Sequence, residues 1–277
     1  PLALLEAFGL PPSALRDDPL AGRAAVAFHY VLRGPVDKGA KEAVERLVQK
    51  VTSQHGNVLF LELRCAGGDM QAASDLAGRL IELQKPTPGA DHDPVQVVAF
   101  VPDKAPDTAA VVALGCSDIV MSRRTDAGAG AEEAEFGDFE AVVGKDPKAA
   151  DTWAGVLRPL AEQQGYPPVL VDGMLRKDVE IVRARRKNNA TVTRLMSGEE
   201  VRADASRGAD AEWVTESTIK AKGQLLKLSA TRAAEVGLAR YVVDGRDPAE
   251  VYAKYGLEPA KVKEASPAWL DRFASFL

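Results

Sequence analysis

Cysteine and histidine are scarce in this chain of 277 residues, and their scarcity argues against several kinds of site. Cys65 and Cys116 are the only cysteines, and each lies at the edge of an apolar run, which excludes a disulfide framework and favours small buried fillers. His29, His55 and His92 fall in a strand, a helix-end turn and a polar loop, without the spacing of a metal site or a catalytic triad. We therefore expect neither a metal ion nor a cofactor.

Long hydrophobic runs and a strong charge of one sign are also missing. No apolar run approaches the roughly 20 residues that a membrane-spanning helix needs. The net charge of −5 is spread over stretches of mixed sign, and the densest basic run, Arg183 to Lys187, has no interleaved aromatic residues. Nucleic acid is therefore not expected as a partner. Because Pro1 is not a translation start, we expect a piece of a longer protein, with any membrane anchor elsewhere.

The patterns that are present indicate one large α/β domain with an appendage. Strand-like and helical periodicities alternate through the first half of the chain. The predicted strands are 24–32, 57–63, 95–100 and 119–122, and the predicted helices are 38–53, 70–83 and 108–114. Strands joined by crossover helices are typical of a parallel sheet. A turn is predicted at Gly34-Pro35, and residues 127–145 have no period and predict a long loop.

The second half adds helices, then a stretch of strands and turns. The predicted helices are 149–164, 168–175 and 230–236, with further ones opened by Asp247 and Ser266, and the predicted strands are 179–186, 191–196 and 239–243. Ser197 and Glu200 have the spacing of a capping box. We expect an N-terminal arm (1–23), an α/β core (24–177), an inserted β-rich excursion (178–228) and the rest of the core with terminal helices (229–277).

Three features occur in an informative order: Cys65-Ala66-Gly67-Gly68-Asp69 after a strand, Ala105-Pro106-Asp107-Thr108 before a helix, and then Lys148. This order resembles the ClpP-class serine proteases of the ClpP/crotonase fold, and it is most similar to the NfeD-type membrane-linked serine proteases. Further matching segments are Leu61-Glu62-Leu63, Ala113-Leu114-Gly115, Lys148-Ala149-Ala150-Asp151 and Leu226-Lys227-Leu228-Ser229-Ala230. The resemblance covers about residues 24–245. It implies an α/β fold, a ClpP/crotonase-like spiral of β-β-α units with an inserted β-hairpin region.

The resemblance also assigns roles to individual residues. Asp107 stands at the position of the nucleophilic serine, and Lys148, 41 residues later, stands at that of the base. Gly67 and Gly68 form the turn of the oxyanion hole, whose donors are implied to be the N–H groups of Gly68 and Thr108. Glycines suit that role because the chain can turn and present its N–H groups to a carbonyl.

Asp107 changes what such a site can do. A Ser-Lys mechanism needs a neutral lysine, whereas a carboxylate beside Lys148 would keep that lysine protonated and would place an anion where the oxyanion forms. Asp is also a preferred N-cap residue, and a helix cap is the simplest interpretation of Asp107. Asp69 is similarly expected to support the start of the next helix. The sequence therefore predicts a degenerate domain, a pseudoenzyme that binds peptides or serves assembly.

The alternatives stay open. An active hydrolase could use Thr108 as nucleophile with Lys148, or Lys145, as base, although β-branching and helical rotation aim the Thr108 hydroxyl elsewhere. Cys65 is a less favoured reactive group, and acyl-CoA chemistry of the crotonase type is a remote third option. The resemblance implies a peptide or protein segment in the cleft, a homo-oligomer and a membrane partner protein. It also implies that this is a soluble segment of a membrane-anchored, bacterial-type protein.

Overall fold

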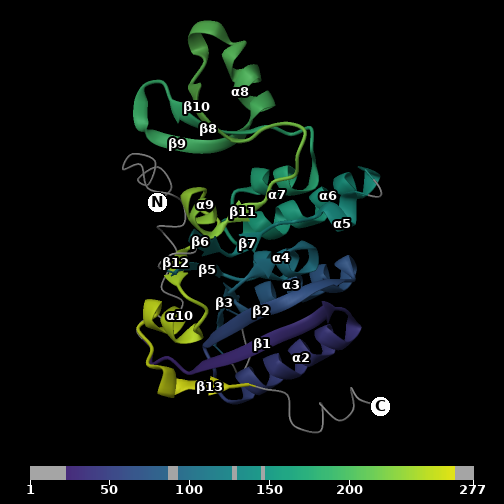
Figure 1. The fold of residues 1–277 in the computed structure, drawn as a ribbon, viewed down its shortest axis with the longest axis vertical. Coiled ribbons are helices and arrows are strands. Elements are labelled where there is room, and N and C mark those ends of the chain that lie inside the picture. Colours follow the sequence, from purple (N-terminus) through teal and green to yellow (C-terminus); the bar gives the residue numbers. More distant parts are fainter. Residues whose placement is uncertain (1–22, 87–92, 127–129, 145–146, 266–277) are drawn as a thin grey trace.

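A parallel sheet lies at the centre of the molecule in the computed structural model, which describes residues 23–86, 93–126, 130–144 and 147–265 (Figure 1). Its strand order is β12-β5-β3-β2-β1-β13, and β6 adds antiparallel to β5. The bounds are β1 Ala27–Val36, β2 Val58–Gly68, β3 Gln96–Val101, β5 Asp118–Asp126, β6 Gly130–Glu133, β12 Tyr241–Asp244 and β13 Val262–Glu264. The helices predicted at residues 2–8 and from Ser266 lie outside the described residues.

Alternation of side chains along the strands builds one core on each face of this sheet. On β2, Leu59, Leu61 and Leu63 point into the larger core, while Val58 and Phe60 point into the smaller one. The larger core is covered by α2 Lys38–Ser53, α3 Met70–Leu83, α4 Asp107–Leu114, α6 Pro147–Gln163 and α7 Pro168–Leu175. The smaller core is covered by α10 Pro248–Lys254. No helix among the described residues is long and apolar enough to cross a membrane.

Two smaller sheets flank the main one. The first has the order β10-β8-β9 and forms, with α8, the upper part of Figure 1. The second has the order β11-β7-β4 and leads into α4 and α5. Their bounds are β8 Ile181–Arg186, β9 Asn189–Ser197, β10 Trp213–Lys220, β4 Lys104–Ala105, β7 Glu135–Phe136 and β11 Leu228–Ser229. The helices are α8 Gly198–Ala205, α5 Glu140–Val143 and α9 Ala230–Glu235, with single 3-10 turns at Gly208–Asp210 and Pro259–Lys261.

The predicted helices agree with the structure to within one or two residues where both describe the chain, and Ser197 and Glu200 form the predicted capping box. Two predictions are wrong. Gly34-Pro35 is part of β1 rather than a turn, because β1 stays paired with β2 as far as Val36, with a register shift on the way. Residues 127–145 are not one long loop, since their described part contains β6, β7 and α5, elements too short to show a period.

A buried histidine joins three strands of the main sheet. His29 on β1 is 4% exposed, and its ring nitrogens lie 3.1 Å from a Glu62 oxygen on β2 and 3.0 Å from a Glu264 oxygen on β13. Burial alone would lower the pKa of His29 and raise that of Glu62. The hydrogen bond between the two side chains, with Glu264 acting on His29 and Arg64 acting on Glu62, outweighs this effect of burial. The pKa of His29 is therefore raised and that of Glu62 lowered. The His29 ring thus ties the short edge strand β13 to the sheet through its contacts with Glu62 and Glu264.

We predict that Glu264→Gln lowers the free energy of unfolding by about 1 kcal/mol at pH 6, the value typical of a partly exposed charged hydrogen bond. Because the pKa of His29 is raised in the folded protein, its contribution to stability is fully present at pH values below the ordinary histidine pKa of about 6.5. This contribution is lost as the pH rises through the raised pKa of the folded state. The deficit should therefore shrink at pH 9. Urea unfolding of both proteins at the two pH values measures it, and an equal deficit at both would contradict the role of His29.

Candidate functional site

The end of β2 forms a glycine turn whose geometry requires both glycines. Gly67 and Gly68 have φ angles of +68° and +115°, in the region that side chains disfavour. A Cβ on Gly68 would lie 2.3 Å from the carbonyl oxygen of Val36, where β1 passes. Asp69 follows, and its carboxylate accepts hydrogen bonds from the amides of Gln71 and Ala72, which confirms that it supports the start of α3. The turn brings the Gly67 amide toward α4.

Asp107 fills this turn with its own carboxylate. Its Oδ1 accepts a hydrogen bond of 2.9 Å from the Gly67 amide and one of 2.5 Å from the Thr108 amide. The side chain is largely buried, at 8% exposure for the residue. The Thr108 N–H, one of the two donors that the resemblance assigns to an oxyanion hole, and the N–H of Gly67 in the same turn therefore donate to a carboxylate oxygen of the same chain.

The N-cap interpretation of Asp107 is wrong. Asp107 is the first helical residue of α4, Pro106 occupies the N-cap position, and no side chain caps the helix. The Pro106 carbonyl accepts hydrogen bonds of 2.9 and 3.3 Å from the amides of Ala109 and Ala110. The carboxylate of Asp107 points instead toward Gly67. The side chain joins two elements rather than closing one helix.

The backbone of Asp107 is held in an unusual conformation. Its φ is +34°, a value that residues with a side chain rarely adopt. The amide of Asp107 donates a hydrogen bond of 2.9 Å to the carbonyl of Asp138. The backbone of Asp107 is therefore held by Asp138, and its side chain is held by Gly67. Strain of this kind persists only where surrounding contacts impose it, and it is concentrated at functional sites.

The hydroxyl of Thr108 is engaged in the same cluster. Thr108 is 1% exposed, and its Oγ1 donates a hydrogen bond of 2.7 Å to the carbonyl of Gly67. Asp107 Oδ1 also lies 3.0 Å from the same Oγ1. A hydroxyl has one proton to donate, and the nearer acceptor is the Gly67 carbonyl. Thr108 therefore fastens the start of α4 to the glycine turn from the other side.

Lys148 lies at an exposed position near the start of α6, a helix that packs against α4. The hydrogen bonds and ion pairs of the described residues include none between Lys148 and Asp107. Lys145, the alternative base, lies outside the described residues. The structure thus brings Gly67, Asp107 and Thr108 into one hydrogen-bonded cluster, and it keeps Lys148 on the neighbouring helix.

Asp138 and Lys227 belong to this region although the sequence did not single out either as a site residue. The ammonium of Lys227 lies 2.6 Å from the carboxylate of Asp138, and this hydrogen bond, against a smaller effect of burial, lowers the pKa of Asp138. The pair lies just beyond the end of the ladder between β11 and β7. Because the carbonyl of Asp138 also holds the Asp107 amide, the pair supports the start of α4. No periodicity in residues 127–145 marks Asp138.

The described residues of this region form no metal site, and its cysteine is not activated as a thiolate. Among the described residues, no three or more His, Cys, Asp or Glu side chains are placed to hold a metal ion. Cys65 is buried beside the turn, and burial first, then the charge of Asp107, raises the pKa of its thiol to about 12. Burial likewise raises the pKa of Cys116.

Comparison with known proteins identifies similar chains. The family profile described as NfeD1b, N-terminal domain, matches residues 28–208. A 1510-N membrane-bound stomatin-specific protease, solved as a lysine-to-alanine mutant with a substrate peptide, has a TM-score of 0.55 and 13% identity over 92% of this chain and 98% of its own. A 1510-N membrane protease specific for a stomatin homolog, from Pyrococcus horikoshii, has a TM-score of 0.55 and 13% identity, and the match covers 91% of this chain and 98% of its own. No curated protein matches. The two structures confirm the ClpP-like α/β fold.

We predict that neither cysteine of the folded protein reacts with iodoacetamide at pH 8. The thiolate is the reactive form, and a thiol with a pKa of about 12 is almost entirely protonated at that pH. Mass spectrometry of the labelled native protein measures the reaction, and protein unfolded in urea is the control in which both cysteines should react. Rapid labelling of native Cys65 would show that the turn opens readily.

Proposed function

The chain belongs to the family of NfeD1b N-terminal domains, and from this premise we propose that it is a ClpP-like domain that binds peptides or serves assembly without cleaving them. One observation carries the proposal. The carboxylate of Asp107 accepts hydrogen bonds from the amides of Gly67 and Thr108, in the turn where an active site would bind an oxyanion. The site is degenerate at the nucleophile position and is filled by its own side chain.

The chemistry of the carboxylate supports this interpretation. An oxyanion hole accelerates a reaction because its donors meet charge that develops only in the transition state. A permanent carboxylate oxygen on the same donors is stabilised at all times, so the donors give no advantage to a reacting carbonyl. Carboxylates that act as nucleophiles attack glycosides, phosphates or reactive acyl groups rather than ordinary peptide bonds.

The alternative of an active peptidase that uses Thr108 receives less support. A nucleophilic hydroxyl needs access to substrate and a base within hydrogen-bond reach. Thr108 is 1% exposed and its hydroxyl donates to the Gly67 carbonyl. Acyl-CoA chemistry has no observation in its favour among the described residues.

Peptide binding, self-association and a membrane context are part of the same proposal. The relative solved with a substrate peptide is described as a membrane-bound protease, and it shares this fold over nearly its whole length. The glycine turn and the start of α4, with the strands β4 and β7 beside it, remain ordered here around Asp107. We propose that a peptide or protein segment binds at this surface and that the domain works as a homo-oligomer next to a membrane partner protein.

We predict that the protein does not react with a fluorophosphonate probe, whereas Asp107→Ser becomes labelled. The new hydroxyl would stand at the helix start with the Gly67 and Thr108 amides released for an oxyanion. The double variant Asp107→Ser, Lys148→Ala is the control and should lose most of the labelling, because it lacks the base. Gel fluorescence and intact-protein mass measure the adduct.

Labelling of the unmodified protein would overturn the proposal. Thr108→Ala then identifies the nucleophile, since an active hydrolase using Thr108 would lose its label in that variant. Failure of Asp107→Ser to label, with its fold intact, would show that the lysine cannot serve as base in this geometry and would refute the Ser-Lys ancestry of the site.

A further inference from the structure

The carboxylate of Asp107 uses only one of its two oxygens inside the protein. Oδ1 accepts hydrogen bonds from the amides of Gly67 and Thr108 and lies 3.0 Å from the Thr108 hydroxyl. Among the hydrogen bonds and ion pairs of the described residues, none goes to Oδ2. The enclosed side-chain atoms of these residues that lack a partner are Arg123 Nε and Arg176 Nε. Oδ2 therefore reaches the surface, although Asp107 as a whole is only 8% exposed.

The negative charge of Asp107 has no cationic partner. No ion pair of the described residues includes Asp107. The amides that bind Oδ1 and the start of α4 favour a carboxylate, but they carry only partial charges. The charge also acts on Cys65, since it raises the pKa of that thiol after the larger effect of burial. A nearly buried carboxylate without a counter-ion is costly.

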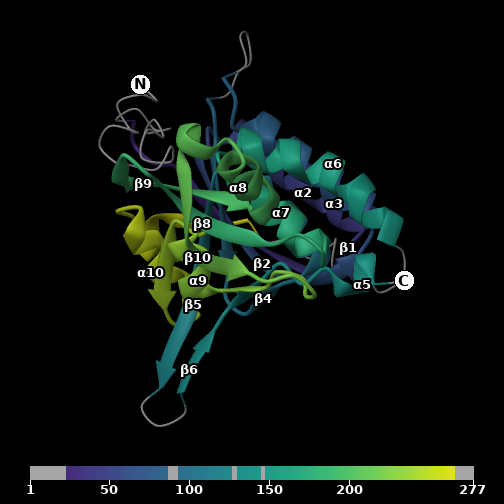
Figure 2. The same ribbon diagram turned by 90° about the horizontal axis from the view of Figure 1, so that it is seen from above.

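The neighbouring cations are paired with other carboxylates. β4 lies beside β2 (Figure 2), and the ammonium of its Lys104 lies 2.9 Å from the carboxylate of Glu135 on β7. Lys227 is paired in the same way with Asp138. The hydrogen bond and charge of Glu135, and then the charge of Asp138, hold the pKa of Lys104 above its ordinary value. Glu135 and Asp138 thus have counter-ions, whereas Asp107 has none.

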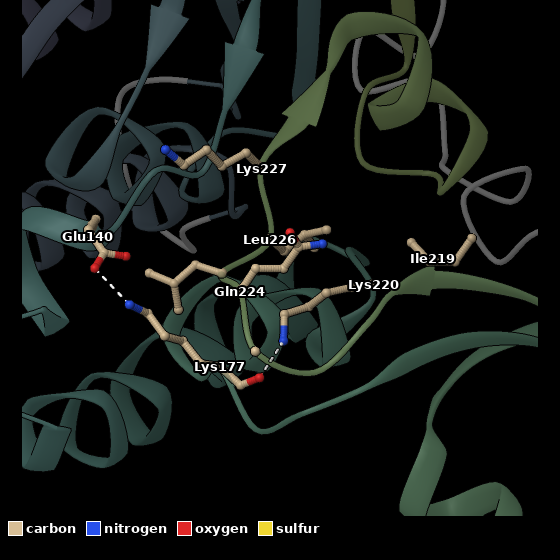
Figure 3. A pocket seen from close by; sticks show the side chains of 9 residues that line it. Glu140, Lys177, Ile219, Lys220, Gln224, Leu226 and Lys227 are labelled. Atoms are coloured by element: carbon tan, nitrogen blue, oxygen red, sulfur yellow. Dashed lines mark hydrogen bonds and ion pairs between the residues drawn. The ribbon is translucent and has the colours of Figure 1, made fainter.

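The lysines of a nearby cavity are engaged as well. This cavity of about 410 Å³ is lined by α5, the segment after α7 and the linker from β10 to β11 (Figure 3). Lys177 is hydrogen-bonded to Glu140, 2.7 Å away, and the ammonium of the buried Lys220 donates to three backbone carbonyls. Asp107 does not line this cavity. Its counter-ion must therefore come from outside the described residues.

We propose that Oδ2 of Asp107 binds a primary ammonium of the peptide, either its N-terminus or a lysine side chain. This inference rests on the proposed peptide-binding function. The ammonium would supply the missing counter-ion and a charge-assisted hydrogen bond. A primary ammonium is compact, which suits an oxygen of a residue that is largely buried. A divalent metal ion fits less well, because the described residues place no three metal-binding side chains together.

The polarity of recognition would then be opposite to that of a protease. An oxyanion hole presents N–H donors, so it takes up a peptide carbonyl. Here the amides of Gly67 and Thr108 donate to Oδ1, and the atom left for a ligand is the acceptor Oδ2. The site therefore selects a positively charged donor rather than the carbonyl of a bond to be cleaved.

The test compares four forms of one nonapeptide library with a fixed central lysine and uncharged residues elsewhere. The N-terminus is free or acetylated, the lysine is free or acetylated, and a C-terminal fluorescein reports binding to the whole chain by anisotropy. At low salt, peptides with the recognised ammonium should bind about fivefold more tightly than the doubly acetylated form, and the difference should fall as salt rises. The two singly acetylated forms show which ammonium is recognised.

A matched pair of variants separates this contact from the general charge of the region. In Asp107→Asn the amide oxygen can still accept from Gly67 and Thr108, which leaves an NH₂ donor in the place of Oδ2. The fivefold preference should disappear, while the doubly acetylated peptide binds as before to within about twofold. Glu135→Gln removes the same charge from an exposed pair nearby and should keep the preference.

Circular dichroism shows whether Asp107→Asn is folded. If it is not, NMR of the unmodified protein takes its place. The Gly67 and Thr108 amide signals should shift when the peptide with the recognised ammonium is added, and they should not shift with the doubly acetylated form.

Equal affinity for all four forms, or a preference that survives in folded Asp107→Asn, would overturn the ammonium subsite while leaving peptide binding intact. Amide signals that respond equally to both peptides would overturn it as well. Absence of binding by every form would refute the peptide-binding function and the subsite with it. The two failures are therefore distinguishable in one experiment.

Discussion

The hydrogen bond from the Gly67 amide to the carboxylate of Asp107 is the contact on which the candidate site depends. It joins the end of β2 to the start of α4, two elements 40 residues apart in the chain. Both ends are in conformations that need support, since Gly67 has a φ of +68° and Asp107 one of +34°. The Thr108 hydroxyl, bound to the Gly67 carbonyl, closes the same contact from the opposite direction. Removal of the carboxylate therefore changes the geometry as well as the charge of the site.

In the proposed function, a carboxylate stands where an active relative would have a hydroxyl, so a charge that would form only during the reaction is replaced by one that is present beforehand. Donors arranged for an oxyanion stabilise a transition state only if they are poorly used before the reaction. Here they are used in the resting protein, which gives a stable local structure instead of a reactive one. The surrounding frame, from the glycine turn to the strands β4 and β7, does not depend on the chemistry and is retained. The proposed function is compatible with this frame, because binding a peptide would need the surface of the fold but no nucleophile.

Much of the fold could be predicted because helical and strand periodicities are local properties. The helix 70–83 was predicted to the residue, since its apolar positions repeat at helical spacing. The geometry of Asp107 could not be predicted, because its partners Gly67 and Asp138 lie 40 and about 30 residues away in the chain. Asp138 lies in a segment without periodicity, so only the tertiary structure shows that it supports the start of α4.

The most direct measurement of the central contact is the NMR chemical shift of the Gly67 and Thr108 amide protons in the protein and in Asp107→Asn. If one carboxylate accepts both hydrogen bonds, both amide protons should be shifted downfield in the protein. Both should move upfield together in Asp107→Asn, because a neutral amide oxygen is a weaker acceptor than a carboxylate. Amide signals that are unaffected by the substitution would contradict the account, because the donors would then be available for another group.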